Sequence, residues 1–331
     1  MNTTVFHTIL KKSQFIFLSK LTLFLAFLYI IYTQLFLQND IHTLYETFQS
    51  QLRSSAYTFL LPIVIFLMPF NWFIESYKWK LLINQFNKNY SLRQAVIAIL
   101  SGLFAALLTP GRVGEYGGRL INISLDNAPK ALLANFVSSL AQNIVNIAFG
   151  IICTVFFLYN YFDFGVNVLV SFFFTAFLIL SFLVFLFVNF EIFNSIIQRL
   201  PSFRWKEKII SQSKYITELE LSFLLKQLFL STIRYITYAS QYVALLFLFE
   251  ITPDIWIAML GVGTIFLLQS NLPLPPVLSI FARGEIALLI WASFSSNSLG
   301  ILCATFVLWF INLLVPALSG SLIFLLKKSR A

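Results

Sequence analysis

Thr109-Pro-Gly-Arg-Val-Gly-Glu-Tyr-Gly-Gly-Arg119 is the stretch in which charge and glycine concentrate within an otherwise apolar sequence. It holds two arginines, one glutamate and four of the chain's twelve glycines, and it follows the apolar run 95–108. Charged side chains inside a membrane are costly and usually face a cavity, a partner or a substrate. We therefore expect a polar site within the bilayer here; the alternative is a solvated cytoplasmic loop with an incidental charge pair.

Composition places the chain among helical membrane proteins. Of its 331 residues, 59% are hydrophobic and 11% are charged, whereas about 25% charged is typical of soluble domains. Apolar runs at 21–37, 166–190 and 298–326 approach or exceed the roughly 20 residues of a spanning helix. The net charge of +9 is explained by basic cytoplasmic loops and anionic headgroups, so we expect no nucleic-acid partner. We expect one transmembrane domain over residues 1–331, in the cytoplasmic membrane of the cell.

The distribution of lysine and arginine predicts how the chain crosses the membrane. The basic clusters at 11–20, 78–93, 199–226 and 327–330 all reach the cytoplasm only if segments 94–109 and 255–296 enter and return on one side. The predicted fold class is an all-α polytopic membrane protein with two reentrant broken-helix hairpins and both termini inside. Six full spans are expected, at about 17–37, 56–74, 131–158, 166–190, 229–250 and 298–326.

The two hairpins suggest an inverted repeat with halves at about 15–190 and 191–326. Pro110 and Pro275 are 165 residues apart, and Arg112-Val-Gly-Glu115 is echoed by Arg283-Gly-Glu285. Paired, Pro- or Gly-interrupted apolar segments in two halves are typical of a transport site near the membrane midplane. Arg283 and Glu285 would share a helix face with each other only if the helix breaks near Gly284.

The first hairpin carries residue types that suit an anion. Thr109 is expected to cap a helix that begins at Pro110, whose free N–H groups would form an anion site. Arg112, Glu115 and Arg119 then fall within about a 60° arc of that helix, and the last two have the favoured order for an ion pair. Arginine suits phosphate through its planar fork of donors.

Gly114 and Gly118 fall on the opposite side of the same helix, where their spacing permits close approach of another helix. The candidate substrate-binding residues are Thr109, Gly111, Arg112, Glu115, Arg119, Arg283 and Glu285. No catalytic residue, metal ligand or cofactor is predicted, and Cys153 and Cys303 are expected to be buried thiols rather than a disulfide.

Other polar positions have less specific explanations. Glu75, Lys78 and Lys80, together with Trp72 and Trp79, are typical of an interfacial belt. Arg234 is expected to extend toward the membrane surface. A polar stripe on the span at 131–158 is expected to make helix–helix hydrogen bonds or to line the cavity; it consists of Asn135, Gln142, Asn143 and Asn146.

On the motifs Pro110-Gly-Arg-Val-Gly-Glu115 and Arg283-Gly-Glu285, the chain resembles the transmembrane, flippase-like domain of lysylphosphatidylglycerol synthases. The resemblance covers nearly the whole chain and implies reentrant helices around a cavity that translocates an anionic phospholipid. The sequence departs from the family at Leu272-Pro-Leu-Pro-Pro276, where a more glycine-rich approach is expected. The soluble aminoacyltransferase domain of the full-length synthases has no counterpart here, so lipid synthesis is not implied.

The favoured function is therefore a lipid transporter, a flippase that moves an anionic, phosphate-bearing lipid between leaflets. That lipid is the expected partner, and a separate enzyme could modify it; the oligomeric state is not determined by the sequence. We expect no enzymatic activity. Two alternatives stay open: a membrane-embedded lipid-phosphate hydrolase, which also needs a nucleophile or general base beside its arginine, and a regulatory membrane protein without transport.

Overall fold

The computed structural model describes residue 46 and residues 56–109, 112–162, 164–199, 215–252, 254–270 and 276–328. The predicted span 17–37, together with Pro110, Gly111 and the turn 271–275, lies outside this part of the chain. The described residues are helical with connecting turns, which confirms the all-α fold class. The helices are α3 (Ala56–Ile83), α4 (Leu92–Leu108), α5 (Val113–Gly118), α6 (Ala128–Tyr161), α7 (Val166–Val188), α8 (Phe190–Arg199), α10 (Leu221–Leu248), α11 (Ile255–Gln269), α12 (Pro276–Trp291), α13 (Ser298–Trp309), the π-helical turn η3 (Phe310–Leu314) and α14 (Val315–Lys328).

In the described part of the chain, four helical segments are long and apolar enough to cross a membrane: Phe59–Ile83, Ala128–Tyr161, Val166–Val188 and Ser298–Ile323. Each overlaps a predicted span. The predicted span 229–250 corresponds to most of α10, a helix of 28 residues that is too polar to be counted with those four. α4 and α11 are apolar but shorter, as expected for the first limbs of the two predicted hairpins.

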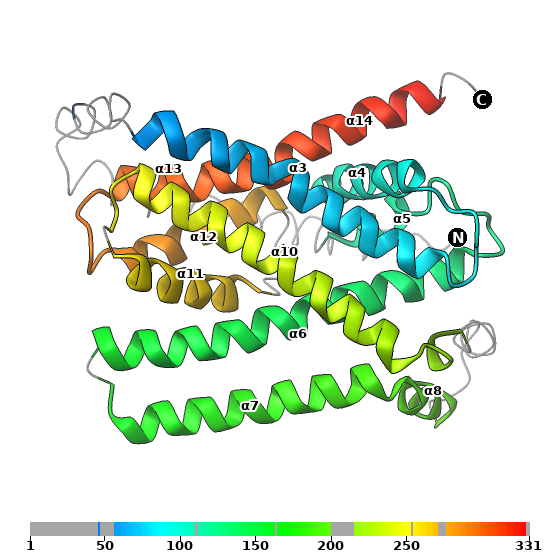
Figure 1. The fold of residues 1–331 in the computed structure, drawn as a ribbon, viewed down its shortest axis with the longest axis horizontal. Coiled ribbons are helices and arrows are strands. Elements are labelled where there is room, and N and C mark those ends of the chain that lie inside the picture. Colours follow the sequence, from blue (N-terminus) through cyan, green and yellow to red (C-terminus); the bar gives the residue numbers. More distant parts are fainter. Residues whose placement is uncertain are drawn as a thin grey trace, which may run out of the picture.

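The long helices run along the long axis of the molecule, and two shorter helix pairs lie at its opposite ends (Figure 1). α4 and α5 pack together at one end, near the C-terminus of α14, while α11 and α12 form a pair at the other end. Neither pair extends along the whole axis. Reentry from opposite membrane faces is compatible with this arrangement and stays a prediction.

Side-chain caps explain where several helices begin. At the start of α4, Ser91 and Gln94 form a capping box in which each side chain accepts the other residue's backbone N–H. Asp254 accepts the N–H groups of Trp256 and Ile257 at the start of α11. Asn297 accepts the N–H of Gly300 and so starts α13. Each cap satisfies backbone donors that the first helical turn leaves without a partner.

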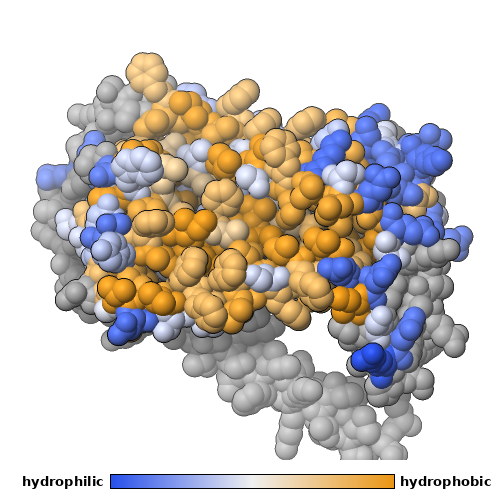
Figure 2. Space-filling view, turned by 60° about the horizontal axis from the view of Figure 1, so that its bottom comes forward, coloured by the Kyte–Doolittle hydropathy of each residue, from blue (hydrophilic) through white to orange (hydrophobic). Residues whose placement is uncertain are grey.

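The exterior matches a membrane environment. A broad apolar band lies between hydrophilic residues gathered at the two ends of the long axis (Figure 2). α7 contributes large exposed apolar side chains such as Phe174 and Phe182. An apolar surface of this extent is not tolerated in water and suits contact with lipid. The protein is thus a multi-pass membrane protein.

The apolar core is divided into two clusters. One cluster holds Val64 of α3 and Val145 of α6, and the other holds Trp79 of α3 and Ala141 of α6. On α3, the polar residues Asn71, Glu75 and Lys78 lie between the two positions in sequence. Polar side chains therefore interrupt the apolar face of α3 between the two clusters.

Candidate functional site

Glu115 forms ion pairs with both arginines of the first hairpin. Its Oε2 lies 2.8 Å from Nη2 of Arg112, and its Oε1 pairs with Nη2 of Arg119. The three side chains therefore meet on one side of α5, and the ion pair predicted between Glu115 and Arg119 is present. Arg112 precedes the helix with a φ of 60°, a left-handed conformation that a non-glycine residue adopts only at some energetic cost.

The start of α5 differs from the prediction. The helix begins at Val113 instead of Pro110, and it spans only six residues, so an anion site built on its N-terminal dipole is not supported. Thr109 ends α4 and links the two limbs of the hairpin, because its Oγ1 donates to the Ala105 carbonyl at 3.0 Å and accepts the Gly114 N–H at 2.7 Å. Thr109 thus caps α5 from a position before its first turn.

Glycine brings α5 against α4, as predicted. A Cβ atom at Gly118 would lie 2.5 Å from the Ser101 carbonyl oxygen and 2.8 Å from Cα of Gly102. A Cβ at Gly114 would overlap the backbone of Ala105. The hairpin is therefore packed backbone to backbone, which fixes the charged face of α5 relative to α4.

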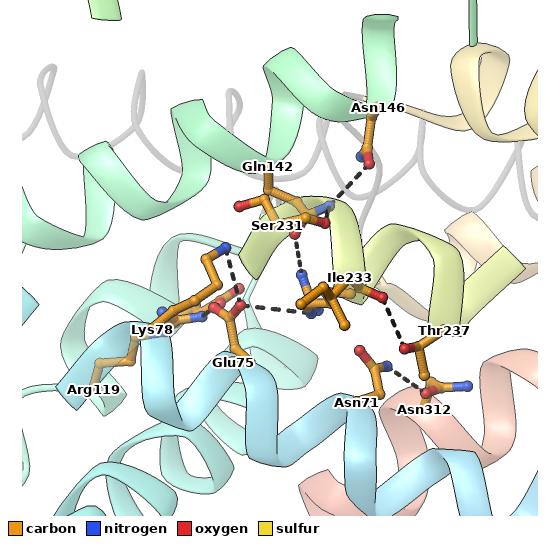
Figure 3. A network of polar contacts seen from close by, with 12 residues as sticks. Asn71, Glu75, Lys78, Arg119, Gln142, Asn146, Ser231, Ile233, Thr237 and Asn312 are labelled. Atoms are coloured by element: carbon orange, nitrogen blue, oxygen red, sulfur yellow. Dashed lines mark hydrogen bonds and ion pairs between the residues drawn. The ribbon is translucent and has the colours of Figure 1, made fainter. Parts of the chain in front are cut away.

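Glu75 of α3 is the centre of the charged cluster. Its Oε1 accepts a hydrogen bond from Nη2 of Arg119 at 2.9 Å. Its Oε2 lies 3.5 Å from Nε of Arg234 on α10 and 3.6 Å from Nζ of Lys78. One carboxylate thus pairs with three cations from three parts of the chain (Figure 3).

Two predictions about these residues were wrong. Glu75, Lys78 and Trp79 do not form an interfacial belt, because all three are buried and Lys78 is 0% exposed. Arg234 is turned inward to Glu75, with Nε 3.5 Å from the carboxylate, although its side chain stays 32% exposed. Glu75 and Arg234 thus pair across two helices that are distant in the sequence.

The Trp79 ring packs against the guanidinium of Arg119. The guanidinium carbon of Arg119 lies 5.4 Å from the centroid of the Trp79 ring, within the range of a cation–π contact. The Trp79 indole donates to the Tyr90 hydroxyl, which donates to the Gln94 carbonyl at 3.2 Å. Burial raises the pKa of the Tyr90 phenol, so it stays a neutral donor.

The polar stripe of α6 reaches the same cluster. Gln142 accepts a hydrogen bond from Nη1 of Arg234 at 3.2 Å and donates to Asn146 at 3.1 Å. Its amide nitrogen also lies 3.4 Å from the Ser231 carbonyl of α10. The expected helix–helix hydrogen bonding is therefore present at Gln142, which joins α6 to α10 beside the charged cluster (Figure 3).

The cluster carries two more positive than negative charges. It comprises four cations and two carboxylates: Lys78, Arg112, Arg119, Arg234, Glu75 and Glu115. The Arg112 and Arg234 side chains are 46% and 32% exposed, while that of Arg119 is 6% exposed. Within the described residues, Nε and Nη1 of Arg119 and Nζ of Lys78 have no hydrogen-bond acceptor. The cluster thus has two partly exposed arginines and retains buried donors that suit an additional anion.

A second polar network lies next to the cluster along α3 and α10. Asn71, one helical turn from Glu75, donates to Asn312 at 2.7 Å, and Asn312 donates to the fully buried Gln241 at 3.0 Å. Asn312 lies in the π-helical turn η3, a local distortion frequent at functional sites. These amides connect three helices without adding charge.

The second hairpin does not reproduce the first. Arg283 donates from Nη1 to Oε1 of Gln269 on the neighbouring α11 at 2.9 Å. α12 continues through Gly284 without a break, so Arg283 and Glu285 point about 200° apart around the helix. Gly284 packs against the Leu302 side chain of α13. Arg283 thus bonds a residue of its own hairpin, and within the described part of the chain the structure shows no hydrogen bond from it to Arg112 or Glu115.

Sequence reasoning missed Glu75, Lys78, Arg234 and the Asn312 network as part of the interior. A periodic signal was present, because Asn71, Glu75 and Lys78 are spaced i, i+4, i+7 in an otherwise apolar helix. Gln227, Ser231 and Arg234 repeat that spacing on α10. Polar residues at this spacing share one helix face, and two such faces would have predicted the pairing.

Comparison with known proteins supports the assignment of the chain as a helical membrane protein. The family model for the lysylphosphatidylglycerol synthase TM region matches residues 16–327. No curated protein and no solved structure matches the chain significantly. The match covers the first hairpin, the charged cluster and the second hairpin, and the family ties the protein to lipid metabolism or transport. The chain therefore belongs to the family of the lysylphosphatidylglycerol synthase TM region.

Proposed function

We propose that this protein is a lipid transporter that moves an anionic, phosphate-bearing lipid between the leaflets of the cell membrane. The observation that carries the proposal is the cluster around Glu75 and Arg119, in which six charged side chains meet among apolar helices. Burying charge in a membrane protein is costly and marks a substrate path or a relay. Two surplus cations favour an anionic substrate.

The geometry supports a headgroup site with the acyl chains left in lipid. Arg112 and Arg234 are the accessible cations of the cluster, and a guanidinium can bind two phosphate oxygens at once. The apolar band on the exterior would stay in contact with the acyl chains (Figure 2). In this proposal α4–α5 and α11–α12 are reentrant hairpins that enter from opposite faces, and the amides of Asn71 and Asn312 lie along the polar interior between them.

Reconstitution into liposomes tests the proposal. Fluorescent phosphatidylglycerol and phosphatidylcholine are placed in the inner leaflet, and their arrival outside is followed by quenching with dithionite. We expect transfer of phosphatidylglycerol that Arg112→Ala and Glu115→Gln abolish and that Arg93→Ala, which removes an exposed arginine of α4, leaves unchanged. Release of inorganic phosphate is measured in parallel on liposomes that also contain phosphatidic acid, a phosphomonoester, because the two fluorescent lipids are phosphodiesters. Phosphate release without transfer would identify a hydrolase, and neither activity would favour a regulatory protein.

A further inference from the structure

We propose that Glu75 is an internal counter-anion: it occupies, between Arg119 and Arg234, the position that the substrate phosphate takes, and it yields these cations when the lipid binds. This inference rests on the proposed function and names a residue that controls affinity at the same site. The carboxylate of Glu75 touches Arg119 at 2.9 Å, Arg234 at 3.5 Å and Lys78 at 3.6 Å. Phosphate oxygens are shared among arginine and lysine donors in the same way.

The other carboxylate of the cluster has a different geometry. Glu115 pairs with Arg112 and Arg119 at i−3 and i+4, so its ion-pair partners among the described residues belong to its own hairpin. Glu75 instead pairs across elements, with the residue that ends α5 and with α10. Removing the Glu75 carboxylate therefore frees cations that face one another across helices, whereas removing Glu115 loosens the hairpin itself.

The gradient of exposure indicates the order of events. Arg234 is partly exposed, whereas Glu75 and Arg119 are buried behind it. An entering phosphate would contact Arg234 first and then Arg119. Lys78 lies deepest and stays beside Glu75 on the same helix, so the carboxylate keeps one partner after the two arginines have moved to the phosphate.

An exchange of this kind keeps binding moderate. Buried arginines without any anion would strongly destabilise the fold, because the desolvation cost of an unpaired charge in the interior is not offset. Glu75 prevents this while the site is free of lipid, and its return would displace the phosphate after transfer. A transport site must bind strongly enough to admit its substrate and weakly enough to release it. Glu75 would provide that balance.

The test compares four proteins: wild type, Glu75→Gln, the double variant Glu75→Gln/Lys78→Met, and Glu191→Gln. The double variant removes both members of the pair, so that it keeps the net charge and leaves no buried ammonium without its carboxylate. Glu191 is an exposed residue of α8, and its substitution matches the charge change of Glu75→Gln away from the cluster. Folding is verified by thermal melting in detergent.

Short-chain phosphatidylglycerol, phosphatidylcholine and inorganic phosphate are titrated separately by calorimetry. We expect both Glu75 variants to bind phosphatidylglycerol about tenfold more tightly, because one charged hydrogen-bonding group is freed for the phosphate. We also expect both variants to transfer the lipid more slowly in liposomes. Glu191→Gln should behave as wild type. An equal gain for inorganic phosphate would support the counter-anion and assign the site to free phosphate.

Unchanged or weaker binding by the folded Glu75 variants would overturn the inference. That result differs from failure of the proposed function, in which the wild-type protein itself neither binds nor transfers phosphatidylglycerol.

Discussion

The second limbs of the two hairpins carry similar short motifs, Arg112-Val-Gly-Glu115 and Arg283-Gly-Glu285, yet their contacts differ. In α4–α5 the backbones touch at Gly118 and Ser101, and Arg119 reaches Glu75 of α3, which in turn pairs with Arg234 of α10. In α11–α12 the hydrogen bond of Arg283 stays within the hairpin at Gln269. A repeated Arg-Gly-Glu pattern therefore does not imply repeated contacts. The first hairpin supplies Arg112, Glu115 and Arg119 to the charged cluster, whereas Arg283 of the second hairpin forms a hydrogen bond within its own hairpin.

We therefore expect the motifs at 112–115 and 283–285 to differ in function. Arg119 links the charged face of the first hairpin to α3, since it pairs with both Glu115 and Glu75. Arg283 has a neutral hydrogen-bond partner, Gln269 of the neighbouring helix. Four experiments test this comparison.

The largest expected effect concerns the side of the membrane on which the ends of each hairpin lie, because a cysteine is either labelled or not. Single cysteines are placed at Lys88 and Asp126, which flank the first hairpin, and at Asp254 and Ser296, which flank the second, in a protein whose Cys153 and Cys303 are replaced by serine. If both pairs are reentrant, an impermeant maleimide added to intact cells labels both residues of the second pair and neither of the first. Labelling of one residue in each pair would show that these helices cross the membrane.

Arg119→Ala should have the largest effect on function and stability, because it leaves the carboxylates of Glu75 and Glu115 without their common cation. Breaking a buried ion pair costs about 3–5 kcal/mol of the free energy of unfolding, which is measured by titration with SDS in mixed micelles. Lipid transfer should fall to background. Arg283→Ala is the matched variant in the second hairpin and should lose less than half as much stability. Equal losses would contradict the difference between the hairpins.

Gly118→Ala should separate α5 from α4, because its methyl group would meet backbone atoms of Ser101 and Gly102 that cannot move aside. The expected loss is about 1–3 kcal/mol of unfolding free energy, together with slower lipid transfer. Gly284→Ala meets the end of the flexible Leu302 side chain at 2.9 Å and should cost less. Gly117→Ala meets no atom within 4 Å and is the neutral control. A neutral Gly118→Ala would show that the hairpin limbs are not in close contact.

Thr109→Val should have the smallest effect. The substitution keeps the shape of the side chain and removes the acceptor for the Gly114 N–H, the loss of a helix cap worth about 1 kcal/mol. Thr232→Val is a suitable control, because the Thr232 hydroxyl only donates to the carbonyl one turn back in α10. Thermal melting of both variants gives the difference, and a larger loss for Thr232→Val would rule out the capping function of Thr109.

Short-range features of the fold were predictable because they depend on neighbouring residues. Apolar length and the basic clusters predicted the helical membrane protein, and helical periodicity predicted that Arg112, Glu115 and Arg119 share a face. Cys153 and Cys303 are free thiols, as predicted, but both are only partly buried instead of fully buried. The exact start of α5 was missed because it depends on the left-handed backbone of Arg112.

By itself, the sequence determined the class of the protein, the positions of its apolar helices and the charged character of residues 109–119. Only the tertiary structure decided which charges meet. Glu75 is 44 residues from Arg119 and 159 from Arg234 in the chain, and their pairing follows from the packing of α3 against α10 and of α5 against α4. Ion-pair partners are chosen by distance in space, and in a helix bundle that distance is set by which apolar faces pack together.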